Sequence, residues 1–366
     1  MDSYPNKFKR LIIPLTVTVI CLYGLYLRML ILNDHEFWAD EYAYLRQMTG
    51  SFGDLLKNIP NEEFCSYLSG DIYLVYPFFK IAPYNKWVLA IPHIIATVAG
   101  FYVLYLLAKR YLTTLSAYLI TFTVVCLNGT LMHHATEIRP YAVLPTLALA
   151  CLYFSLELVE KGQTMSGKRR WCIGAFFVMV LWFHLYGLLT LVFPIAFALF
   201  TKIGDKSFKS ILLYTVKFLL IVFFVAAPLW LVSVFGPHLP RGGDSYGFST
   251  YMFIPNPFTD SVGFLKAIFG NLVGRKNLYF LLVFMLTPFL LSYKERFQQI
   301  AFLLILVLVP VGVLFVLDVA HNYFFVQRQF IWTMPFFALF LGWSFDSFNS
   351  YLQQRPFCRK IFKGGI

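Results

Sequence analysis

Long apolar runs alternate with short polar segments along almost the entire chain of 366 residues. A helix needs about 20 apolar residues to cross roughly 30 Å of hydrocarbon. Runs that approach this length predict membrane spans near residues 11–32, 87–108, 111–129, 141–158, 171–185, 188–201, 211–235, 277–292, 298–317 and 329–346. The two runs between residues 171 and 201 also fit one long bent helix, so about ten spans are expected without a fixed number.

The polar segments that carry most of the ionisable residues predict four external loops. They cover residues 33–86, 132–142, 236–276 and 318–328. In the first loop, the stretch "SFGDLLKNI" repeats apolar residues at helical spacing, which predicts a short amphipathic helix in the membrane interface. The expected fold is an all-α polytopic membrane protein, with one module over residues 1–346 and a basic cytoplasmic tail over 347–366.

Composition agrees with this pattern. Hydrophobic residues make up 59% of the chain and charged residues 13%, and the mean hydropathy is +0.68. These values lie far outside the range of soluble domains, so no soluble domain is expected. The first apolar run contains Arg28 and lacks a small-residue cleavage site, which indicates an uncleaved span rather than a signal peptide.

The net charge of +12 would suit nucleic-acid binding if the basic residues were gathered on one exposed surface. With the N-terminus in the cytoplasm, however, 18 of the 30 basic residues fall on the inner side, and 12 of the 18 acidic residues fall outside. This is the asymmetry of the positive-inside rule. The charge therefore indicates orientation, with both termini cytoplasmic and no nucleic-acid partner. Because Cys65 is the one external cysteine, no disulfide framework is expected.

Two short external segments carry the candidate chemistry. The stretch "HEFWADEYAYLR" places Asp40 and Glu41 just after Trp38 and the first span. In the second loop, "MHHATEIRPYA" places Glu137 and Arg139 at a helix entrance on the same membrane face. Acids in a first helical turn and a surface ion pair are the ordinary structural alternatives. Ionisable groups at a membrane edge are costly, however, and favour a functional interpretation.

The two segments together resemble the polyprenyl-phosphate-sugar-dependent glycosyltransferases of the GT-C type. The branch that includes protein O-mannosyltransferases and the bacterial aminoarabinose transferase of lipid A is the most similar. Members carry a W-x-D-E-like motif in the first external loop, here "WADE", and an E-x-R-P-Y-like segment at a later helix entrance, here "EIRPY". The stretches 89–112 and 328–343 also resemble family helices.

The resemblance implies a GT-C-like bundle that transfers a sugar, with inversion, from a polyprenyl-phosphate-linked donor to an acceptor hydroxyl or amine outside the membrane. A phosphate leaving group needs no general acid, but the acceptor needs a base, and direct attack uses one carboxylate. The resemblance and the position nominate Asp40 as this base. Glu41 is expected to be a reserve base or to orient the acceptor.

Other residues are expected to bind the substrates. The departing phosphate gains charge and calls for cations, for which arginine offers bidentate contacts. The candidates for phosphate or substrate binding are Glu137, Arg139, Tyr141, His133, His134, Arg275, Lys276, His321 and Arg328. Arg275 and Lys276 also fit a role as interfacial anchors, and His184 and Tyr186 are expected to be structural. The acids have the chemistry to hold a divalent metal ion, although no spacing requires a metal or any other cofactor.

Two alternatives remain at this stage. A transporter or flippase should place ionisable groups at mid-bilayer in broken, repeated helices, whereas Arg28 and Lys217 lie near the ends of their spans. An O-antigen ligase or polymerase should depend on Arg and His in large external loops and tolerate loss of Asp40. The expected partners are a polyprenyl-phosphate-linked sugar, a lipid, glycan or protein acceptor, and membrane lipid. The expected location is the bacterial cytoplasmic membrane, with an outward-facing site.

Overall fold

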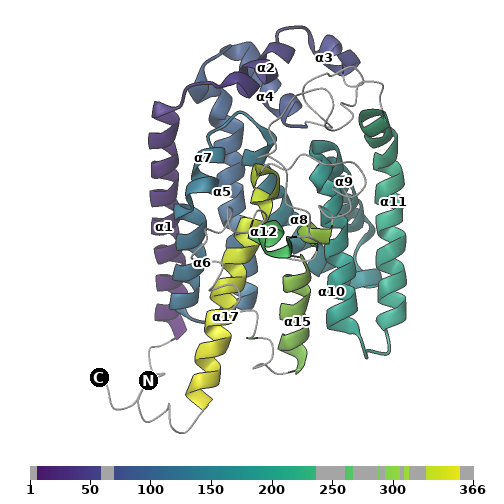
Figure 1. Ribbon diagram of the computed structural model, residues 1–366. Helices are drawn as coiled ribbons and strands as arrows, with labels where there is room; N and C mark the ends of the chain where they lie inside the picture. Colours follow the sequence, from purple (N-terminus) through teal and green to yellow (C-terminus); the bar gives the residue numbers. More distant parts are fainter. Residues whose placement is uncertain are drawn as a thin grey trace.

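The computed structural model describes residues 6–58, 70–235, 260–266, 287, 293–305, 309–312 and 327–354. Every regular element in these ranges is helical, which confirms the all-α prediction. Long helices run roughly side by side, and the short helices α2, α3 and α4 lie across one end of the bundle (Figure 1). The start of α1 and the end of α17 lie together at the opposite end. This arrangement agrees with the expectation that both termini lie on the same side of the membrane.

Three helices in the described part of the chain are long and apolar enough to cross a membrane. They are α1 (Asn6–Asp34), α5 (Lys86–Tyr111) and α11 (Phe208–Phe235). These helices coincide with predicted spans, and large apolar side chains such as Leu15, Leu22 and Phe224 are exposed on their outer faces. Such surfaces suit lipid rather than water, so the chain is an integral membrane protein.

The remaining predicted spans correspond to shorter or shifted helices. These are α6 (Leu115–Leu127), α8 (Leu144–Lys161), α9 (Gly167–Phe183), α10 (Val192–Lys202), α15 (Tyr293–Leu303) and α17 (Met334–Gln354). The last helix continues past residue 346, where its span was expected to end. Apart from residue 287, the span expected at 277–292 lies outside the described residues.

The region 171–201 forms two helices rather than one long bent helix. Helix α9 ends at Phe183, and the 3₁₀-helix η4 (Leu185–Leu191) leads into α10. Gly187 of η4 packs against the main chain of Val180 and Leu181, where a Cβ atom would lie 2.8 Å from the Val180 carbonyl carbon. The chain therefore folds back on the last turn of α9, and no side chain other than hydrogen fits at this contact.

Close helix contacts and one buried arginine hold the first part of the bundle together. A Cβ atom on Gly24 would lie 2.7 Å from the Cβ atom of Cys126, so α1 and α6 touch backbone to backbone. One turn further along α1, Arg28 donates to the carbonyl oxygens of Cys126 at 3.0 Å and Val125 at 3.3 Å. These are terminal carbonyls of α6 that lack partners within their helix. Arg28 therefore caps the C-terminal end of α6.

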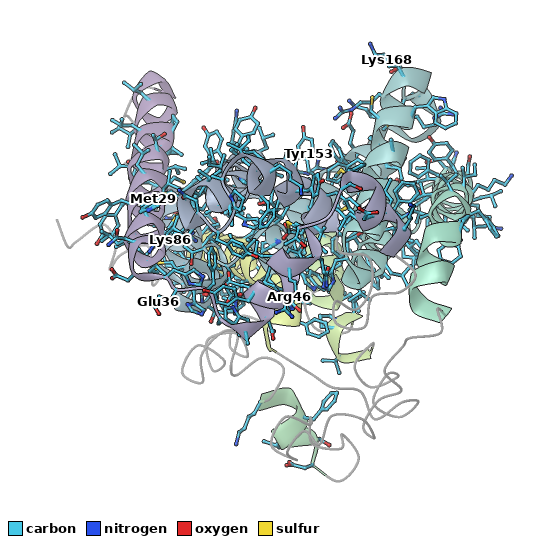
Figure 2. All side chains as sticks on the ribbon, turned by 90° about the horizontal axis from the view of Figure 1, so that it is seen from above. Met29, Glu36, Arg46, Lys86, Tyr153 and Lys168 are labelled. Carbon is cyan, nitrogen blue, oxygen red and sulfur yellow. The ribbon has the colours of Figure 1, made fainter. Side chains whose placement is uncertain are left out.

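A cap covers the end of the bundle away from the start of α1, and it consists of α2 (Ala39–Gln47), α3 (Phe52–Asn58) and α4 (Gly70–Ile81). Helix α3 confirms the short amphipathic helix expected from "SFGDLLKNI": Leu55 is buried, whereas Phe52 and Leu56 are exposed. Lys86, at the start of α5, donates to the carbonyl oxygen of His35 at 3.1 Å, and in the view from above it lies on the side of α1 (Figure 2). This hydrogen bond joins the segment that leads into the cap to the first residue of the helix that follows it.

The cap has a hydrophobic core of its own, which we call the cap core. Its buried members are Leu32, Tyr44, Leu45, Met48, Leu55, Ile72, Val75, Phe79, Leu89, Ala90 and Ile138. Ile138 is the member contributed by the second external segment, and its side chain is fully buried. Because Ile138 lies between Glu137 and Arg139, the cap core fixes the position of both charged residues.

Candidate active site

Glu41 joins the two motif-bearing segments. It is the third residue of α2, and its side chain is fully buried. One carboxylate oxygen accepts from the N–H of Ile138 at 2.6 Å, and the other accepts from the N–H of Trp38 at 3.2 Å. Nε2 of His35 lies 2.9 Å from the second oxygen, and this hydrogen bond raises the pKa of His35. Both oxygens of Glu41 are therefore engaged within the protein.

Asp40 and Arg139 face each other as a consequence. Asp40 precedes Glu41, and Arg139 follows Ile138, so the hydrogen bond between Glu41 and Ile138 sets their separation. Oδ2 of Asp40 lies 3.8 Å from Nη2 of Arg139, and the two side chains are 39% and 13% exposed. The carboxylate can thus be reached from outside, while the cation beside it is mostly enclosed. The structure brings together the two residues that the sequence placed in separate motifs.

Aromatic rings line the enclosed side of Arg139. Its guanidinium carbon lies 5.7 Å from the ring centre of Tyr44 and 5.9 Å from that of Tyr141. Both distances are within the range of cation–π attraction. Tyr141 lies in the 3₁₀-helix η2 (Pro140–Ala142), where Pro140 opens the helical turn. Tyr44 lies on α2 together with Asp40.

Glu137 faces the other way and contacts two histidines. Helix α7 (Gly129–His134) ends with His133 and His134. Nδ1 of His134 lies 2.8 Å, and Nε2 of His133 lies 3.3 Å, from the carboxylate of Glu137. Glu137 is 3% exposed, whereas His133 is largely exposed. Within the described residues, no group of three or more His, Cys, Asp or Glu side chains is arranged to hold a metal ion.

A buried polar chain that the sequence did not reveal runs behind Arg139. The hydroxyl of Tyr44 donates to Oδ2 of Asp71 at 3.0 Å, and Nε2 of His93 lies 2.9 Å from Oδ1 of the same carboxylate. Asp71 and His93 are fully buried. His93 was detectable in principle, because an ionisable residue within an apolar run is a functional candidate by default. Asp71 belongs to no motif, and only the fold brings it here.

His184 completes the cluster from the turn after α9. Its ring centre lies 5.7 Å from that of Tyr141. Burial lowers the pKa of His184 to about 4, and the positive charge of Arg139 adds to this effect. His184 is therefore neutral at physiological pH and adds no positive charge to the site. The side chain of Tyr186 lies outside the described residues.

Four candidate cations from the sequence are not placed by the structure. Arg275, Lys276 and His321 lie outside the described residues. Arg328 belongs to the 3₁₀-helix η9 (Gln327–Thr333), but its side chain is also outside the described part. Their roles in phosphate binding stay predictions.

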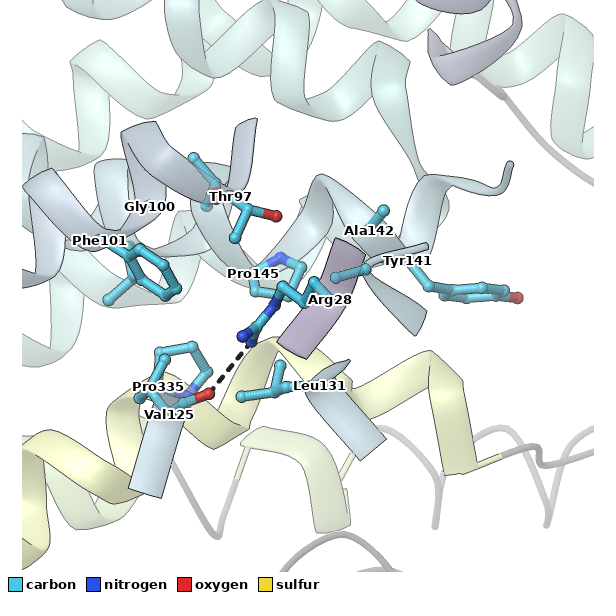
Figure 3. Close-up of a pocket in the computed structure, with 13 residues that line it drawn as sticks. Arg28, Thr97, Gly100, Phe101, Val125, Leu131, Tyr141, Ala142, Pro145 and Pro335 are labelled. Carbon is cyan, nitrogen blue, oxygen red and sulfur yellow. Dashed lines mark hydrogen bonds between the residues drawn. The ribbon is translucent and has the colours of Figure 1, made fainter. Parts of the chain in front are cut away.

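An apolar cleft adjoins the polar cluster. It is a small, half-open cleft lined by residues of α1, α5, α6, α8 and α17. Arg28 extends through it toward the carbonyl of Val125 (Figure 3). Tyr141 lines the cleft and also contacts Arg139. Tyr141 therefore separates the cleft from Arg139 and contacts both.

Comparison with known proteins agrees with the resemblance seen in the sequence. A family model described as dolichyl-phosphate-mannose-protein mannosyltransferase matches residues 72–231, which run from α4 to α11 and include the segment around Arg139. Among solved structures, the chain is similar to ArnT from Cupriavidus metallidurans in the apo state. The sequences are 14% identical and the TM-score is 0.51.

The structural match covers 94% of this chain and 62% of ArnT. The chain thus spans less than two thirds of the length of that protein. A search of curated proteins gave no match. The structural match shows that the chain has the helical fold of ArnT, and the family model agrees with the glycosyltransferase resemblance seen in the sequence.

Proposed function

We propose that this chain transfers a sugar, with inversion, from a polyprenyl-phosphate-linked donor to an acceptor hydroxyl or amine at the outer face of the membrane. The observation that carries the proposal is the pairing of Asp40 with Arg139 at 3.8 Å. The exposed carboxylate can take a proton from the acceptor. The enclosed cation beside it can balance the negative charge that develops on the departing phosphate.

In the proposed reaction, Asp40 takes the proton from the acceptor as the acceptor oxygen or nitrogen attacks the anomeric carbon. The bond between this carbon and the phosphate oxygen breaks on the opposite face, and its electrons leave with the phosphate. Arg139, which faces Asp40 before the donor binds, then balances the charge on the departing phosphate. Because attack and departure occur on opposite faces, the anomeric configuration inverts.

The surroundings of the two acids in "WADE" support Asp40 as the base rather than Glu41. Both oxygens of Glu41 already accept hydrogen bonds within the protein, and the side chain is buried. Asp40 keeps an exposed fraction of 39%, so an acceptor can approach it. Glu41 then acts as a positioning residue for Asp40. Glu137, with His133 and His134, is proposed to contact the substrate at the edge of the site.

Two observations support a lipid-linked donor. The matching family is described by its use of dolichyl-phosphate-mannose, a sugar on a polyprenyl phosphate. The apolar cleft beside Tyr141 also offers an isoprenoid chain a wall next to the charged cluster. We further propose that the cap faces outward from a bacterial cytoplasmic membrane and that both termini are cytoplasmic. The charge distribution along the sequence supports this orientation.

A transfer assay tests the proposal. Membranes that contain the wild-type chain would be supplied with labelled polyprenyl-phosphate sugars and a bacterial envelope extract as acceptor. Asp40→Asn keeps the shape of the side chain and removes its basicity, so transfer should fall by about 10²–10⁴-fold. Glu36→Gln is the matched control, because Glu36 is an exposed acid four residues earlier on the same segment, and it should transfer at the wild-type rate.

Equal transfer by wild type and Asp40→Asn, at equal expression, would exclude Asp40 as the base. Transfer with retention of the anomeric configuration would exclude direct attack. A chain that transfers no sugar from any polyprenyl-phosphate donor, while a known transferase in the same membranes does, would count against the proposed function as a whole.

A further inference from the structure

The buried chain of Tyr44, Asp71 and His93 connects three elements of the cap and bundle. Tyr44 belongs to α2, Asp71 to the first turn of α4, and His93 to the second turn of α5. The hydrogen bonds are 3.0 Å and 2.9 Å long, and each uses a different oxygen of Asp71. Each of the three side chains is at most 1% exposed. This is a built arrangement rather than a chance surface contact.

Such an arrangement is costly when stability is the only requirement. Burial removes the hydration of a carboxylate, and apolar side chains of similar volume often stabilise a core as well or better. The cap core next to this chain contains buried apolar side chains such as Leu45, Ile72 and Val75. The presence of Asp71 and His93 in this core therefore suggests a role other than stability, namely to hold a neighbouring group in place.

The group that they hold is the ring of Tyr44. The ring is attached at one end to α2, and its hydroxyl is tied to Asp71 at the other end. His93 occupies the second oxygen of Asp71, so the first oxygen stays directed at Tyr44. The guanidinium of Arg139 lies over this ring at 5.7 Å and extends toward Asp40.

We propose that Asp71 and His93 are positioning residues for Arg139 and act through the ring of Tyr44. Their hydrogen bonds fix the surface on which the guanidinium rests, and this surface directs the cation toward Asp40. The further step, in which the oriented cation serves the departing phosphate, rests on the proposed function. The geometric step does not, because it concerns only contacts within the chain.

The geometric step can be tested without any assay of transfer. A dicarbonyl reagent such as phenylglyoxal modifies arginine side chains at a rate that depends on their accessibility. Tyr44→Phe keeps the ring and removes the hydrogen bond to Asp71, so Arg139 should be modified several-fold faster than in wild type. Asp71→Ala removes the acceptor altogether and should have the same effect. Mass spectrometry of the purified full-length protein would give the rate at each arginine.

The chain supplies two controls for this measurement. Arg46 is an exposed arginine on the same helix as Tyr44, and its rate should be identical in all variants. Tyr42→Phe removes the hydroxyl of an exposed tyrosine two residues before Tyr44, and it should leave Arg139 unchanged. An unaltered Arg139 rate in Tyr44→Phe, with folding intact by thermal unfolding, would overturn the proposal even if Asp71→Ala failed to fold.

A double-mutant cycle separates positioning from general stability. If Tyr44→Phe acts through Arg139, it should lower the turnover number about 10- to 100-fold in the wild-type background, with a smaller change in the donor KM. In an Arg139→Ala background it should have little further effect. Equal losses in both backgrounds would show that the buried chain only stabilises the cap. Faster Arg139 modification together with a fully active Asp40→Asn would support the positioning role and reject the proposed base.

Discussion

The carboxylate of Glu41 accepts a hydrogen bond from the N–H of Ile138 at 2.6 Å, although the two residues are 97 positions apart in the chain. This bond connects the first turn of α2 to the segment that carries Arg139. It also explains why the two short motifs in the sequence belong to one site. The neighbours of the bonded pair, Asp40 and Arg139, are the residues that face each other.

The first prediction concerns this bond. In Glu41→Gln one carboxylate oxygen becomes an amide NH₂, which cannot accept from either backbone N–H. The resulting loss of a buried hydrogen bond should destabilise the protein by about 1–3 kcal/mol, and transfer should fall because Asp40 and Arg139 separate. Thermal unfolding and the transfer assay, with Glu36→Gln as control, would measure both effects. Unchanged stability and activity would show that Glu41 does not connect the two segments.

The second prediction concerns the side chain of Ile138. Ile138→Ala leaves a cavity in the cap core, and truncations of this kind cost about 2–5 kcal/mol. Backbone amides of α2 and α4 should then exchange hydrogen faster, while those of α11 should not. Ile95→Ala is the matched control because Ile95 is exposed on α5. If the exchange rates of α2 and α4 matched the wild type, the cap core would not depend on this residue.

The third prediction concerns pH. The pKa of His184 is lowered from its ordinary value of 6.5 to about 4 by burial. Between these values the unfolded chain binds a proton that the folded chain does not. The contribution of His184 to stability should therefore be complete above pH 6.5 and should fall as the pH decreases toward 4. Thermal unfolding at pH 7 and pH 5 should show a smaller difference for His184→Gln than for wild type; equal differences would contradict the burial effect.

The fourth prediction concerns Arg28. Arg28→Met removes the donor for the carbonyls of Val125 and Cys126, which lack partners within α6. The loss should be about 1.5–3 kcal/mol, as for other hydrogen bonds to charged groups. Lys217→Met is the comparison, since Lys217 is an exposed basic residue within a span and should matter less. Equal stability of Arg28→Met and wild type would exclude the capping role.

Much of the fold was predictable because membrane spans are local features of sequence. The lengths of the apolar runs located α1, α5 and α11, and a pattern of nine residues located α3. The cap core was not predictable in this way. Residues such as Leu45, Ile72 and Ile138 carry no shared period, and they meet only when three short helices fold over the bundle.

The candidate site likewise contains residues that local motifs revealed and residues that only the fold brings together. Asp40 and Arg139 were found because each lies in a compact motif on the expected outer face. The partners of Asp71 are 27 and 22 positions away, in an external segment and in an apolar run. Nothing in the local sequence links them. Tyr44, by contrast, lies one helical turn after Asp40, so helical geometry alone brings the two near each other.

The segment from Glu137 to Arg139 gives three consecutive residues three different surroundings: a pair of histidines, the apolar cap core and the aspartate opposite. Insertion or deletion of a single residue here would move a charge into the cap core and an isoleucine into the site. Such a change would affect folding and chemistry at the same time. Over evolutionary time this segment should therefore vary in neither length nor order, and changes in acceptor choice should arise in other loops around the site.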